Sequence, residues 1–378
     1  MASPELFSKG AYAVHAMEMC KAMDKLGVEF EAVVPGSFEK RDIFEYYGVE
    51  KPFNLKSLPL TRYAGRQLTH GVSSAIYALS NRKRFDLVLT LNIICAAVTA
   101  KAGFPTVYDA HHPPVNPLAR ALFRSFRNSP SLPAVSFNSG GLRRIYVEDG
   151  LSESKTVVAH NGAETEDFEN RPGRDEIRKQ LGISEEKPVV CYCGNTYEGR
   201  GIENLIDAAA EIKDALFLIV GGRDCDNAPH IRAAEERGID NFVVKGFVPH
   251  TEVPPYLLAS DVLALPYTDA VTIKGGTRAA DFTSPMKLFE YMAAGKPIVA
   301  TAIPTVLEVL KDGEDSVVTA PGDRAGFTAA IRRCLDEPVF AEAIGKRARE
   351  KARKYTWEQR VSTILSFVSE KREGSKPL

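Results

Sequence analysis

The stretch DFTSPMKLFEYMAAGKPIVAT, residues 281–301, predicts a helix that leads directly into a buried strand. Ser284 is the expected N-cap and Pro285 the expected first helical residue, because proline fits the first turn of a helix. A Gly-Lys-Pro sequence then ends the helix. Lys287 falls in the first turn, where the helix dipole disfavours a cation unless an anion such as a phosphate binds there.

The same pairing of helix and strand runs through the whole chain. Continuous Val, Ile, Leu and Ala runs are typical of strands buried on both faces. Their alternation with helical patterns of about 10–15 residues is typical of a parallel, doubly wound sheet, so the expected fold class is α/β. The expected strands are 28–35, 85–92, 105–111, 134–138, 155–160, 188–194, 216–222, 241–248, 262–266, 297–301 and 316–320.

The acidic, turn-rich stretch 161–174 interrupts this alternation and is interpreted as a domain linker. With 378 residues, 44% of them hydrophobic, the chain is long enough for two domains. A helix expected at 11–26 precedes the first expected strand, and its approach looks like a loop that normally follows a strand. The N-terminal domain is therefore expected to lack its usual first strand or to have a truncated start.

The charge balance excludes several classes of protein. Lys and Arg total 48 against 49 Asp and Glu, which excludes a histone-like protein and does not favour a nucleic-acid partner. Six cysteines do not make a disulfide scaffold in a chain of this length. The longest apolar run is too short to span a bilayer, so a cytoplasmic protein is expected. Residues 51–160 are locally basic, with 14 Lys and Arg against 5 Asp and Glu.

A second candidate anion site is GNTYEGRG, residues 194–201, which joins an expected strand to a helix beginning near Ile202. Its glycines permit close backbone approach, and Arg200 supplies a forked cation suited to a diphosphate. Glu290 lies three residues after Lys287 on the same helix face, where a carboxylate could accept both hydroxyls of a ribose. The alternative is a surface Lys–Glu pair.

SPMKLFEYMAAGKPIVAT, with the upstream YCGNTYEGRGIENLIDAA, resembles the C-terminal domain of retaining glycosyltransferases of family 4 (group 1), which have the GT-B fold. SKGAYAVHAMEMCKAMDKLGVEFEAVVP, VYDAHHPP and VVAHNGAETEDF are similar to the opening loop and helix, the histidine segment and the domain junction of that family. The resemblance implies two facing Rossmann-like parallel-sheet domains with an interdomain cleft. Residues 1–163 would form the acceptor-side domain and 164–355 the nucleotide-sugar domain, with a helix in 356–378 returning to the first domain.

The resemblance also implies the roles of individual residues. His111 would lie beside the donor sugar, Arg200 and Lys287 would bind the diphosphate, and Glu290 would bind the ribose. The other residues expected to contact the donor are Gly10, Gly194, Asn195, Gly201, Thr283, Ser284, Met286 and Leu288.

The chain departs from the family pattern at two positions. Phe282 stands where the family has the first of two glutamates eight residues apart, and Asn195 stands where it often has arginine. Asp281, beside Phe282, is a candidate substitute for the missing carboxylate. Lys274 and Arg278 belong to an extra basic loop that could close over the diphosphate or remain solvated.

These observations lead to the hypothesis of a retaining glycosyltransferase. It would move a sugar from a nucleoside diphosphate sugar to a hydroxyl of a carbohydrate or lipid-linked acceptor. The chain shows no assignable carboxylate nucleophile of the kind that retaining hydrolases use. The resemblance implies same-face transfer assisted by the leaving phosphate, with no required metal or other cofactor. An epimerase of the same fold acting on nucleoside diphosphate sugars and a degenerate, non-catalytic binding subunit remain as alternatives.

Two patterns that could suggest a metal site are discounted. Asp224-Cys225-Asp226 has the D-x-D spacing, but it lies far in sequence from the expected site. The pair His111–His112 lacks carboxylate or thiolate partners at the spacing of metal ligands. No metal is therefore expected.

Residues 117–127 predict a basic amphipathic helix. Leu118, Leu122 and Phe126 recur every four residues, and arginines, Arg120 among them, form the other face. Such a helix either packs its apolar face on the sheet or lies on an anionic membrane. Peripheral membrane contact through the basic N-terminal domain is the expectation that follows from the second alternative.

Overall fold

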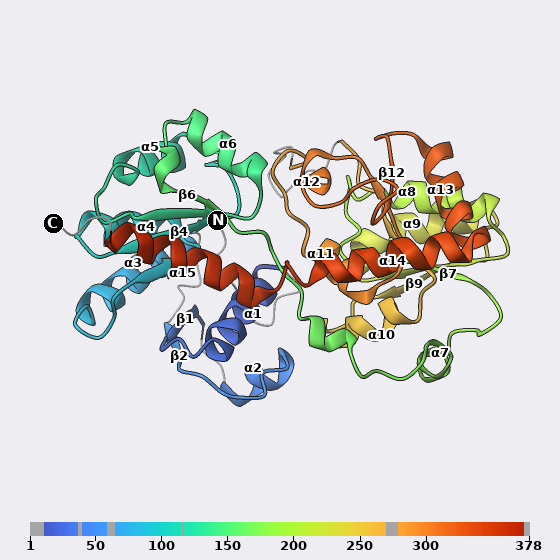
Figure 1. Ribbon diagram of the computed structural model, residues 1–378, viewed down its shortest axis with the longest axis horizontal. Helices are drawn as coiled ribbons and strands as arrows, with labels where there is room; N and C mark the ends of the chain where they lie inside the picture. Colours follow the sequence, from blue (N-terminus) through green and yellow to red (C-terminus); the bar gives the residue numbers. More distant parts are fainter. Residues whose placement is uncertain (1–10, 37–39, 59–64, 115, 270–278, 374–378) are drawn as a thin grey trace. The chain divides into compact units, whose positions relative to one another are not determined.

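The computed structural model describes residues 11–36, 40–58, 65–114, 116–269 and 279–373. The chain forms two compact units. The N-terminal unit comprises residues 1–161 and 357–378, and the C-terminal unit comprises residues 162–356. Each unit is built of parallel strands and helices (Figure 1), which confirms the predicted α/β class.

Two parallel sheets form the N-terminal unit, one of four strands in the order β3-β4-β5-β6 and one of two strands, β1-β2. Its elements are α1 (Ala11–Lys25), β1 (Ala32–Pro35), α2 (Lys40–Tyr46), β2 (Leu55–Leu58), α3 (Arg66–Ser80), β3 (Val88–Thr90), α4 (Ile93–Lys101), β4 (Thr106–Ala110), α5 (Pro117–Phe126), β5 (Ala134–Phe137), α6 (Gly140–Glu148), β6 (Thr156–Val158) and α15 (Trp357–Glu373). Helix α15, from the far end of the chain, packs against α1.

Five predicted strands form here as β1, β3, β4, β5 and β6, each inside its predicted bounds. Strand β2 was not predicted, because Leu-Lys-Ser-Leu is short and lacks the continuous apolar run of the other strands. The expected helix at 11–26 forms as α1, the first element of the described chain. Gly10 and the rest of residues 1–10 lie outside the described residues.

Helix α5 differs from its predicted pattern. Phe123 and Phe126 are buried, but Leu118, expected on the same apolar face, is 79% exposed. The helix packs against α4, and its first turn extends beyond this contact surface. No described helix combines the length and apolar character that a membrane crossing requires.

One parallel sheet, in the order β12-β11-β10-β7-β8-β9, forms the centre of the C-terminal unit. The strands are β7 (Val189–Cys193), β8 (Leu216–Val220), β9 (Phe242–Gly246), β10 (Val262–Leu265), β11 (Ile298–Thr301) and β12 (Val317–Thr319), as predicted. The helices are α7 (Arg174–Leu181), α8 (Ile202–Glu211), α9 (Asp224–Glu236), α10 (Val253–Leu258), α11 (Met286–Ala294), α12 (Pro304–Leu307), α13 (Arg324–Asp336) and α14 (Pro338–Ala352).

The strand order reverses between β7 and β10, which pair through Val190 and Val262. In open α/β sheets, ligands bind outside the carboxyl ends of the strands at this reversal, which we call the switch point. The order of the C-terminal sheet therefore indicates where a ligand would bind before any side chain is considered.

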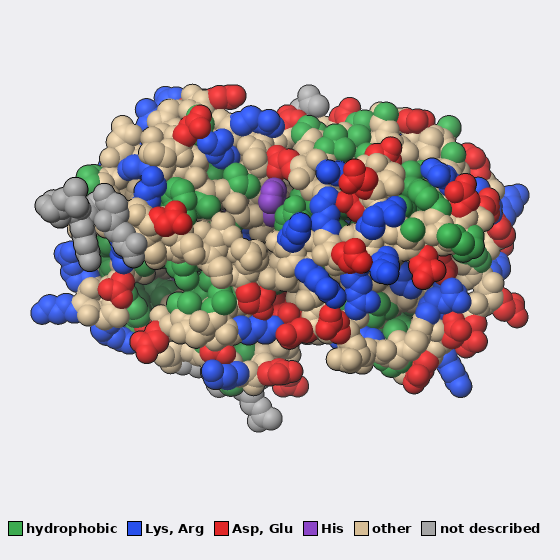
Figure 2. Space-filling view, viewed as in Figure 1, with side chains coloured by type: hydrophobic (Ala, Val, Ile, Leu, Met, Phe, Trp, Pro, Cys, Tyr) green, Lys and Arg blue, Asp and Glu red, His purple; other side chains and the backbone are tan. Residues whose placement is uncertain are grey.

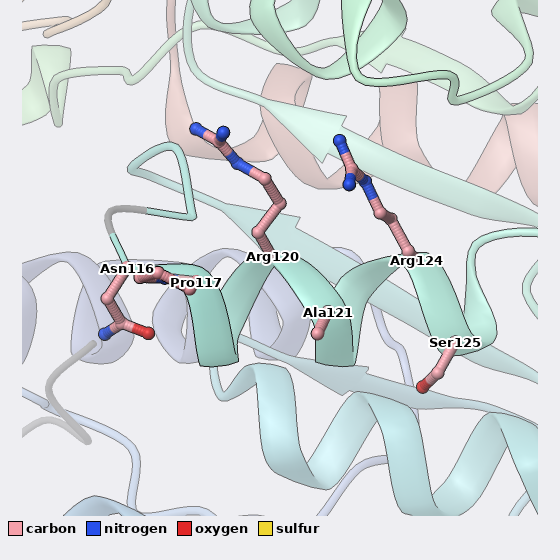
Figure 3. A pocket seen from close by; sticks show the side chains of 6 residues that line it. All are labelled: Asn116, Pro117, Arg120, Ala121, Arg124 and Ser125. Carbon is pink, nitrogen blue, oxygen red and sulfur yellow. The ribbon is translucent and has the colours of Figure 1, made fainter.

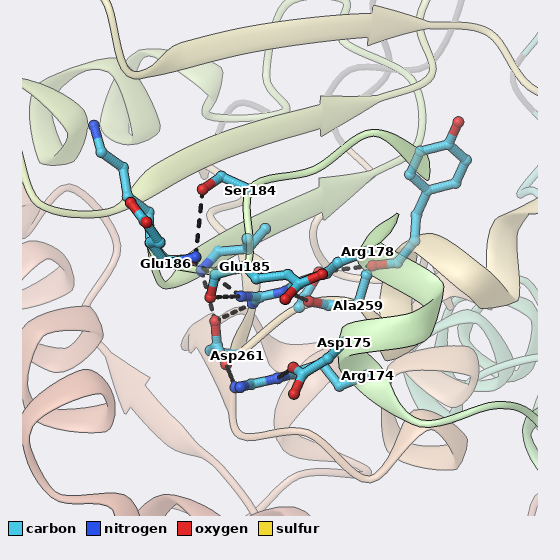
Figure 4. Close-up of polar contacts among 12 residues, drawn as sticks. Arg174, Asp175, Arg178, Ser184, Glu185, Glu186, Ala259 and Asp261 are labelled. Atoms are coloured by element: carbon cyan, nitrogen blue, oxygen red, sulfur yellow. Dashed lines mark hydrogen bonds and ion pairs between the residues drawn. The ribbon is translucent and has the colours of Figure 1, made fainter. Parts of the chain in front are cut away.

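A buried arginine fixes the opposite, amino ends of β7 and β10 (Figure 4). Arg178, 1% exposed, donates to the carbonyl of Ala259 at 2.8 Å and to Asp261 at 2.5 Å. Asp261 also accepts from Arg174 at 2.7 Å and from the amide of Val189 at 2.7 Å. Because the buried charge is fully paired, this network joins α7 rigidly to both strands.

The surface of the C-terminal unit carries mixed charge. Figure 2 shows Lys and Arg side chains interspersed with Asp and Glu side chains over the face on which α14 lies. Arg333 pairs with Glu337 at 3.2 Å, and Arg332 pairs with Asp214 at 2.6 Å. Exposed pairs of this kind contribute little to stability and are typical of a solvated face.

Helix α11 begins one residue later than predicted. Pro285 is its N-cap, with an extended ψ of 123°, so the first helical residue is Met286 and Ser284 does not cap the helix. Proline fits both positions in φ, which is why the sequence pattern did not separate them. The predicted end at Gly295 is confirmed by its left-handed φ of 68°. Lys287 is the second helical residue, in the first turn as predicted.

Candidate functional site

Two glycines shape the carboxyl ends of β7 and β10. Gly194 follows β7 with a φ of 144°, and a Cβ on it would collide with the Lys287 ammonium. Gly201 precedes α8 with a φ of 70°, and a Cβ there would collide with the carbonyl of Pro266, just after β10. Only glycine permits both the backbone conformation and the close approach, so these two residues let the loop lie against the switch point.

Lys287 reaches this place from the first turn of α11. Its Nζ donates to the Tyr192 hydroxyl at 2.8 Å and lies 4.1 Å from the centroid of the Tyr192 ring. The Tyr267 ring centroid is 5.3 Å from the same nitrogen. Burial, together with the nearby charge of Arg200, holds the pKa of Lys287 well below its usual range. The lysine is therefore placed where an added negative charge would stabilise its ammonium form.

Arg200, in the loop just before α8, also lies against Tyr267. It is 8% exposed, and its guanidinium carbon lies 5.0 Å from the Tyr267 ring centroid and 4.5 Å from that of Tyr197, whose hydroxyl accepts from it. Within the part of the chain that the structure describes, neither Arg200 nor Lys287 makes an ion pair. The Arg200 Nε and the Thr283 Oγ1 are buried there with no hydrogen-bond partner. Two basic side chains thus converge on Tyr267, an arrangement that suits an anion.

Glu290 lies one turn further along α11. Its Oε1 contacts the Nε2 of His250 at 2.6 Å, and its side chain is 13% exposed. His250 opens a short 3-10 turn, His250–Glu252, after β9. Glu290 pairs with His250, and Lys287 contacts tyrosines. The contacts of the described residues therefore do not include the alternative, a surface pair of Lys287 and Glu290.

The remaining candidate residues of this unit differ in how far they are buried. Ser284 is buried, Thr283 and Met286 are half-buried, and Leu288 is fully buried. The carbonyl of Asn195 accepts from the Tyr192 hydroxyl, which holds the loop against β7. Asp281 is exposed on the surface, whereas Phe282 beside it is buried. Lys274 and Arg278 lie outside the described residues.

His111 belongs to the N-terminal unit, directly after β4. It is 7% exposed, and its Nε2 lies 3.2 Å from the Asp109 carboxylate. His15 of α1 contacts the same carboxylate oxygen at 3.3 Å. The other oxygen of Asp109 accepts from Arg360 of α15 at 2.6 Å and from Ser136 at 2.7 Å. We call Asp109, His15, His111 and Arg360 the Asp109 cluster.

This cluster was not predicted, and the histidines were discounted as metal ligands for want of a carboxylate. That interpretation was wrong, because Asp109 is two residues from His111 and alternate residues of a strand share a face. The i, i+2 spacing was the available signal. His15 and Arg360 gave no such signal in the sequence, because they contact Asp109 across 94 and 251 residues.

The ligand atoms of His15, Asp109 and His111 all lie within 4.8 Å of one another, a spacing that could hold a metal ion. The surrounding charges argue against one. The Arg360 guanidinium already balances the Asp109 carboxylate, and each histidine donates a hydrogen bond to it. A divalent cation would meet the arginine at short range and would displace both hydrogen bonds.

Burial sets the charges in the cluster. It lowers the pKa of His15 to about 3, with the nearby His111 acting in the same direction, so His15 is neutral. Burial alone would raise the pKa of Asp109, but Arg360 and His111 hold it well below its usual range. The cluster therefore contains an ionised aspartate paired with an arginine, and a neutral His15.

Two family models match this chain. The model for Glycosyl transferases group 1 matches residues 173–351, and the model for Glycosyltransferase Family 4 matches residues 12–167. Together they span most of both units. The chain belongs to the group 1 glycosyltransferases. This assignment confirms the resemblance found in the sequence.

Curated relatives of this chain are distant in sequence, and they are named as transferases of sugars. The 2-deoxystreptamine glucosyltransferase of Streptomyces kanamyceticus is 26% identical over 262 residues, 67% of this chain and 63% of that enzyme. The alpha-D-kanosaminyltransferase of the same organism is 26% identical over 48% of this chain and 45% of its own length. The MMP alpha-(1->4)-mannosyltransferase of Mycolicibacterium hassiacum is 25% identical over 82% of this chain and 77% of that enzyme. For the first two, the chain thus spans less than two thirds of the relative.

Solved structures show the same GT-B fold. HepE of Anabaena in complex with UDP has a TM-score of 0.71 at 18% identity, covering 95% of this chain and 97% of that one. A glycosyltransferase of Rickettsia africae has a TM-score of 0.75 at 14% identity, over 97% and 96%. The sucrose-phosphate synthase of Thermosynechococcus elongatus has a TM-score of 0.74 at 17% identity, over 97% and 94%. These neighbours show the GT-B fold.

Proposed function

We propose that this chain is a retaining glycosyltransferase. It transfers a sugar from a nucleoside diphosphate sugar to a hydroxyl of a carbohydrate or lipid-linked acceptor. The observation that carries the proposal is the pair of cations, Arg200 and Lys287, which meet over Tyr267 at the switch point without an ion-pair partner among the described residues. A diphosphate is the anion that matches two adjacent cations at the end of a helix.

In the proposed reaction these cations act on the leaving group. Negative charge develops on the departing diphosphate as the bond to the sugar breaks. Preorganised cations in a partly dry site stabilise that charge, and this term is usually large in catalysis. Arg200 is always charged, and diphosphate binding would restore the ammonium form of Lys287, whose pKa is lowered in the free protein.

Glu290 is proposed to bind the ribose. Its contact with His250 at 2.6 Å engages one carboxylate oxygen and orients the other, which could accept from ribose hydroxyls. HepE binds UDP and UDP-glucose, which supports a nucleotide sugar as the donor here. Other names among the relatives, a glucosyltransferase and a mannosyltransferase, support a hexose as the transferred group.

The contacts of Asp109 and Glu290 favour same-face transfer over a mechanism with a carboxylate nucleophile. Asp109 is held by Arg360 and Glu290 by His250, so neither is placed as an unpaired nucleophile. His111 is proposed to lie beside the donor sugar, as the family resemblance implies. We infer that the leaving phosphate itself assists the incoming hydroxyl and that turnover requires no metal.

A peripheral contact with an anionic membrane, next to a lipid-linked acceptor, is proposed through α5. Figure 3 shows Arg120 and Arg124 pointing to the same side of this helix. They line a shallow hollow of about 680 Å³, and Leu118 is exposed in the preceding turn. Arg124 also pairs with Asp149 at 2.5 Å. Co-sedimentation with anionic vesicles at low salt should be weakened by Arg120→Glu, and an absence of binding by the wild type would remove this contact.

The test of the overall proposal is a donor and acceptor screen. Nucleoside diphosphate sugars are incubated with and without acceptor hydroxyls, and release of the nucleoside diphosphate is followed in the presence and absence of EDTA. We expect release that requires the acceptor, resists EDTA and gives a product with the anomeric configuration of the donor by NMR. Conversion of the donor alone to another nucleotide sugar would indicate an epimerase, and a complete lack of turnover a binding subunit.

A further inference from the structure

We propose that Asp109 and Arg360 are positioning residues that hold His111 in a single orientation beside the donor sugar. The inference rests on the proposed function, since it concerns how His111 is presented to the donor. It assigns a role to the C-terminal helix α15, which supplies Arg360.

Asp109 uses both carboxylate oxygens. Oδ1 accepts from Arg360 Nη2 at 2.6 Å and from Ser136 Oγ at 2.7 Å, while Oδ2 accepts from His111 Nε2 at 3.2 Å and from His15 Nε2 at 3.3 Å. All five side chains are more than nine-tenths buried. A buried carboxylate with this many donors cannot turn without losing several hydrogen bonds, so it is a fixed reference point for His111.

The second nitrogen of His111 is also defined. Its Nδ1 lies 3.5 Å from the side-chain amide nitrogen of Asn138, at the end of β5. Nε2 thus faces Asp109 while Nδ1 faces Asn138. Its edge also packs on His15, with ring centroids 4.3 Å apart. The ring is therefore held from three sides.

Helix α15 supplies the counter-charge that makes this arrangement stable. Arg360 is 2% exposed, and Trp357, one turn earlier, packs edge-on against His15 with centroids 5.2 Å apart. Glu358 of the same turn pairs with Lys25 at the end of α1 at 3.3 Å. Three successive contacts thus anchor the start of α15 beside the histidine segment, where the chain re-enters the N-terminal unit.

Charge balance explains why Arg360 matters. Without Arg360, the buried Asp109 carboxylate would face two histidines and would draw a proton onto one of them. In glycosyl transfer the sugar ring gains positive character in the transition state. An imidazolium beside it would oppose that charge, whereas a neutral imidazole would not. Arg360 thus acts on the reaction through Asp109 and His111, without touching the sugar.

The test compares four variants of the full chain: Arg360→Met, Asp109→Asn, the double variant Asp109→Asn/Arg360→Met, and Lys25→Met as the control. Lys25→Met removes a contact of the same helix turn away from Asp109. Two readouts are used, the split between kcat and donor KM, and the ring nitrogen chemical shifts of protein labelled with 15N-histidine, assigned with His15→Asn and His111→Asn.

We expect Arg360→Met to lower kcat by about 10- to 100-fold, as for other residues that orient a functional side chain through hydrogen bonds, with donor KM nearly unchanged. One histidine of this variant should show imidazolium shifts at neutral pH. The double variant should recover stability and the histidine shifts of the wild type, because its charges balance again, yet keep a lowered kcat because the carboxylate acceptor of His111 is gone. Lys25→Met should match the wild type in both readouts.

The proposal is overturned if Arg360→Met folds and keeps both the kcat and the histidine shifts of the wild type. If the single variants do not fold, the double variant decides, and wild-type kcat in it would show that the pair serves stability alone. If no donor is turned over by the wild type, the proposed reaction fails, while the histidine shifts of Arg360→Met still test the positioning claim. Unchanged shifts there would overturn it separately.

Discussion

The Lys287 ammonium and the Tyr192 hydroxyl are joined at 2.8 Å, across 95 residues of sequence. Tyr192 is the next-to-last residue of β7, and Lys287 lies in the first turn of the helix that follows β10. The hydrogen bond therefore joins β7 to α11, beside the place where the sheet order reverses. It places a lysine of lowered pKa at the point where a parallel sheet of this order binds its ligand.

Replacing Lys287 with methionine should lower turnover by about 100- to 1,000-fold, the usual effect of removing one group that stabilises charge in the transition state. Methionine keeps the length and loses the charge. Lys346→Met, at an exposed position on α14, is the matched control and should leave the rate unchanged. Steady-state rates at saturating donor measure the effect, and equal rates for the two variants would remove Lys287 from the mechanism.

Nucleotide binding should take up protons. Burial and the charge of Arg200 lower the pKa of Lys287 in the free protein, and a bound diphosphate would raise it. Above the pKa of the free protein, binding therefore adds a proton, and affinity falls as the pH rises towards the pKa of the complex. Calorimetry in buffers of different ionisation enthalpy, from about pH 6 to 9, measures this uptake. Lys287→Met should abolish it, and a wild type without any uptake would contradict the assignment.

The Glu290→Gln variant should distinguish binding of the ribose from binding of the phosphates. The amide is isosteric but is a poorer acceptor for ribose hydroxyls, so nucleoside diphosphate should bind about 10-fold more weakly, the equivalent of about 1.4 kcal/mol. Inorganic pyrophosphate, which has no ribose, should bind as it does to the wild type. Lys287→Met should weaken both ligands. A Glu290→Gln variant that loses pyrophosphate as strongly as nucleotide would show that the carboxylate acts on the whole site.

Stability should fall in mild acid. Burial lowers the pKa of His15 to about 3 and those of His70 and His112 to about 4, against 6.5 in the unfolded chain. Their contribution is complete above pH 6.5 and is lost as the pH falls towards 4, because the unfolded state binds protons first. Each histidine changes the free energy of unfolding by about 1.4 kcal/mol per pH unit in this window.

Urea denaturation at a series of pH values measures this slope. His70→Gln is the informative variant, since His70 contacts Ser73 and Ser74 on its own helix. The variant should lose about one histidine's share of the slope. An identical slope for His70→Gln and the wild type would show that His70 is not protonated on unfolding.

Much of the fold could be predicted from the sequence because its strands are buried on both faces. Such strands appear as continuous apolar runs, and eleven of them formed within their predicted bounds. Strand β2, Leu-Lys-Ser-Leu, carries no such run and was missed. The start of α11 was predicted one residue early because Pro285 satisfies the φ of both an N-cap and a first helical residue.

The candidate residues of the two units were predictable to different degrees. Arg200, Lys287 and Glu290 lie within the two loop-and-helix segments at the switch point, so local sequence patterns were enough to find them. The Asp109 cluster depends on contacts of Asp109 with His15 and Arg360, which are remote in sequence. No spacing rule connects residues that only the folded N-terminal unit brings together.

The most direct test of the central claim, that a nucleoside diphosphate binds over Arg200 and Lys287, is a thermal-shift panel. UDP, GDP, ADP and CDP and their common sugars are each added to the wild type, Lys287→Met and Glu290→Ala. At about 100 times its Kd a ligand adds about 2.7 kcal/mol of stability, a rise of several degrees in Tm. We predict that one nucleotide raises the Tm of the wild type and that both variants lose most of this rise. No shift with any nucleotide, or the same shift in all three proteins, would contradict the account.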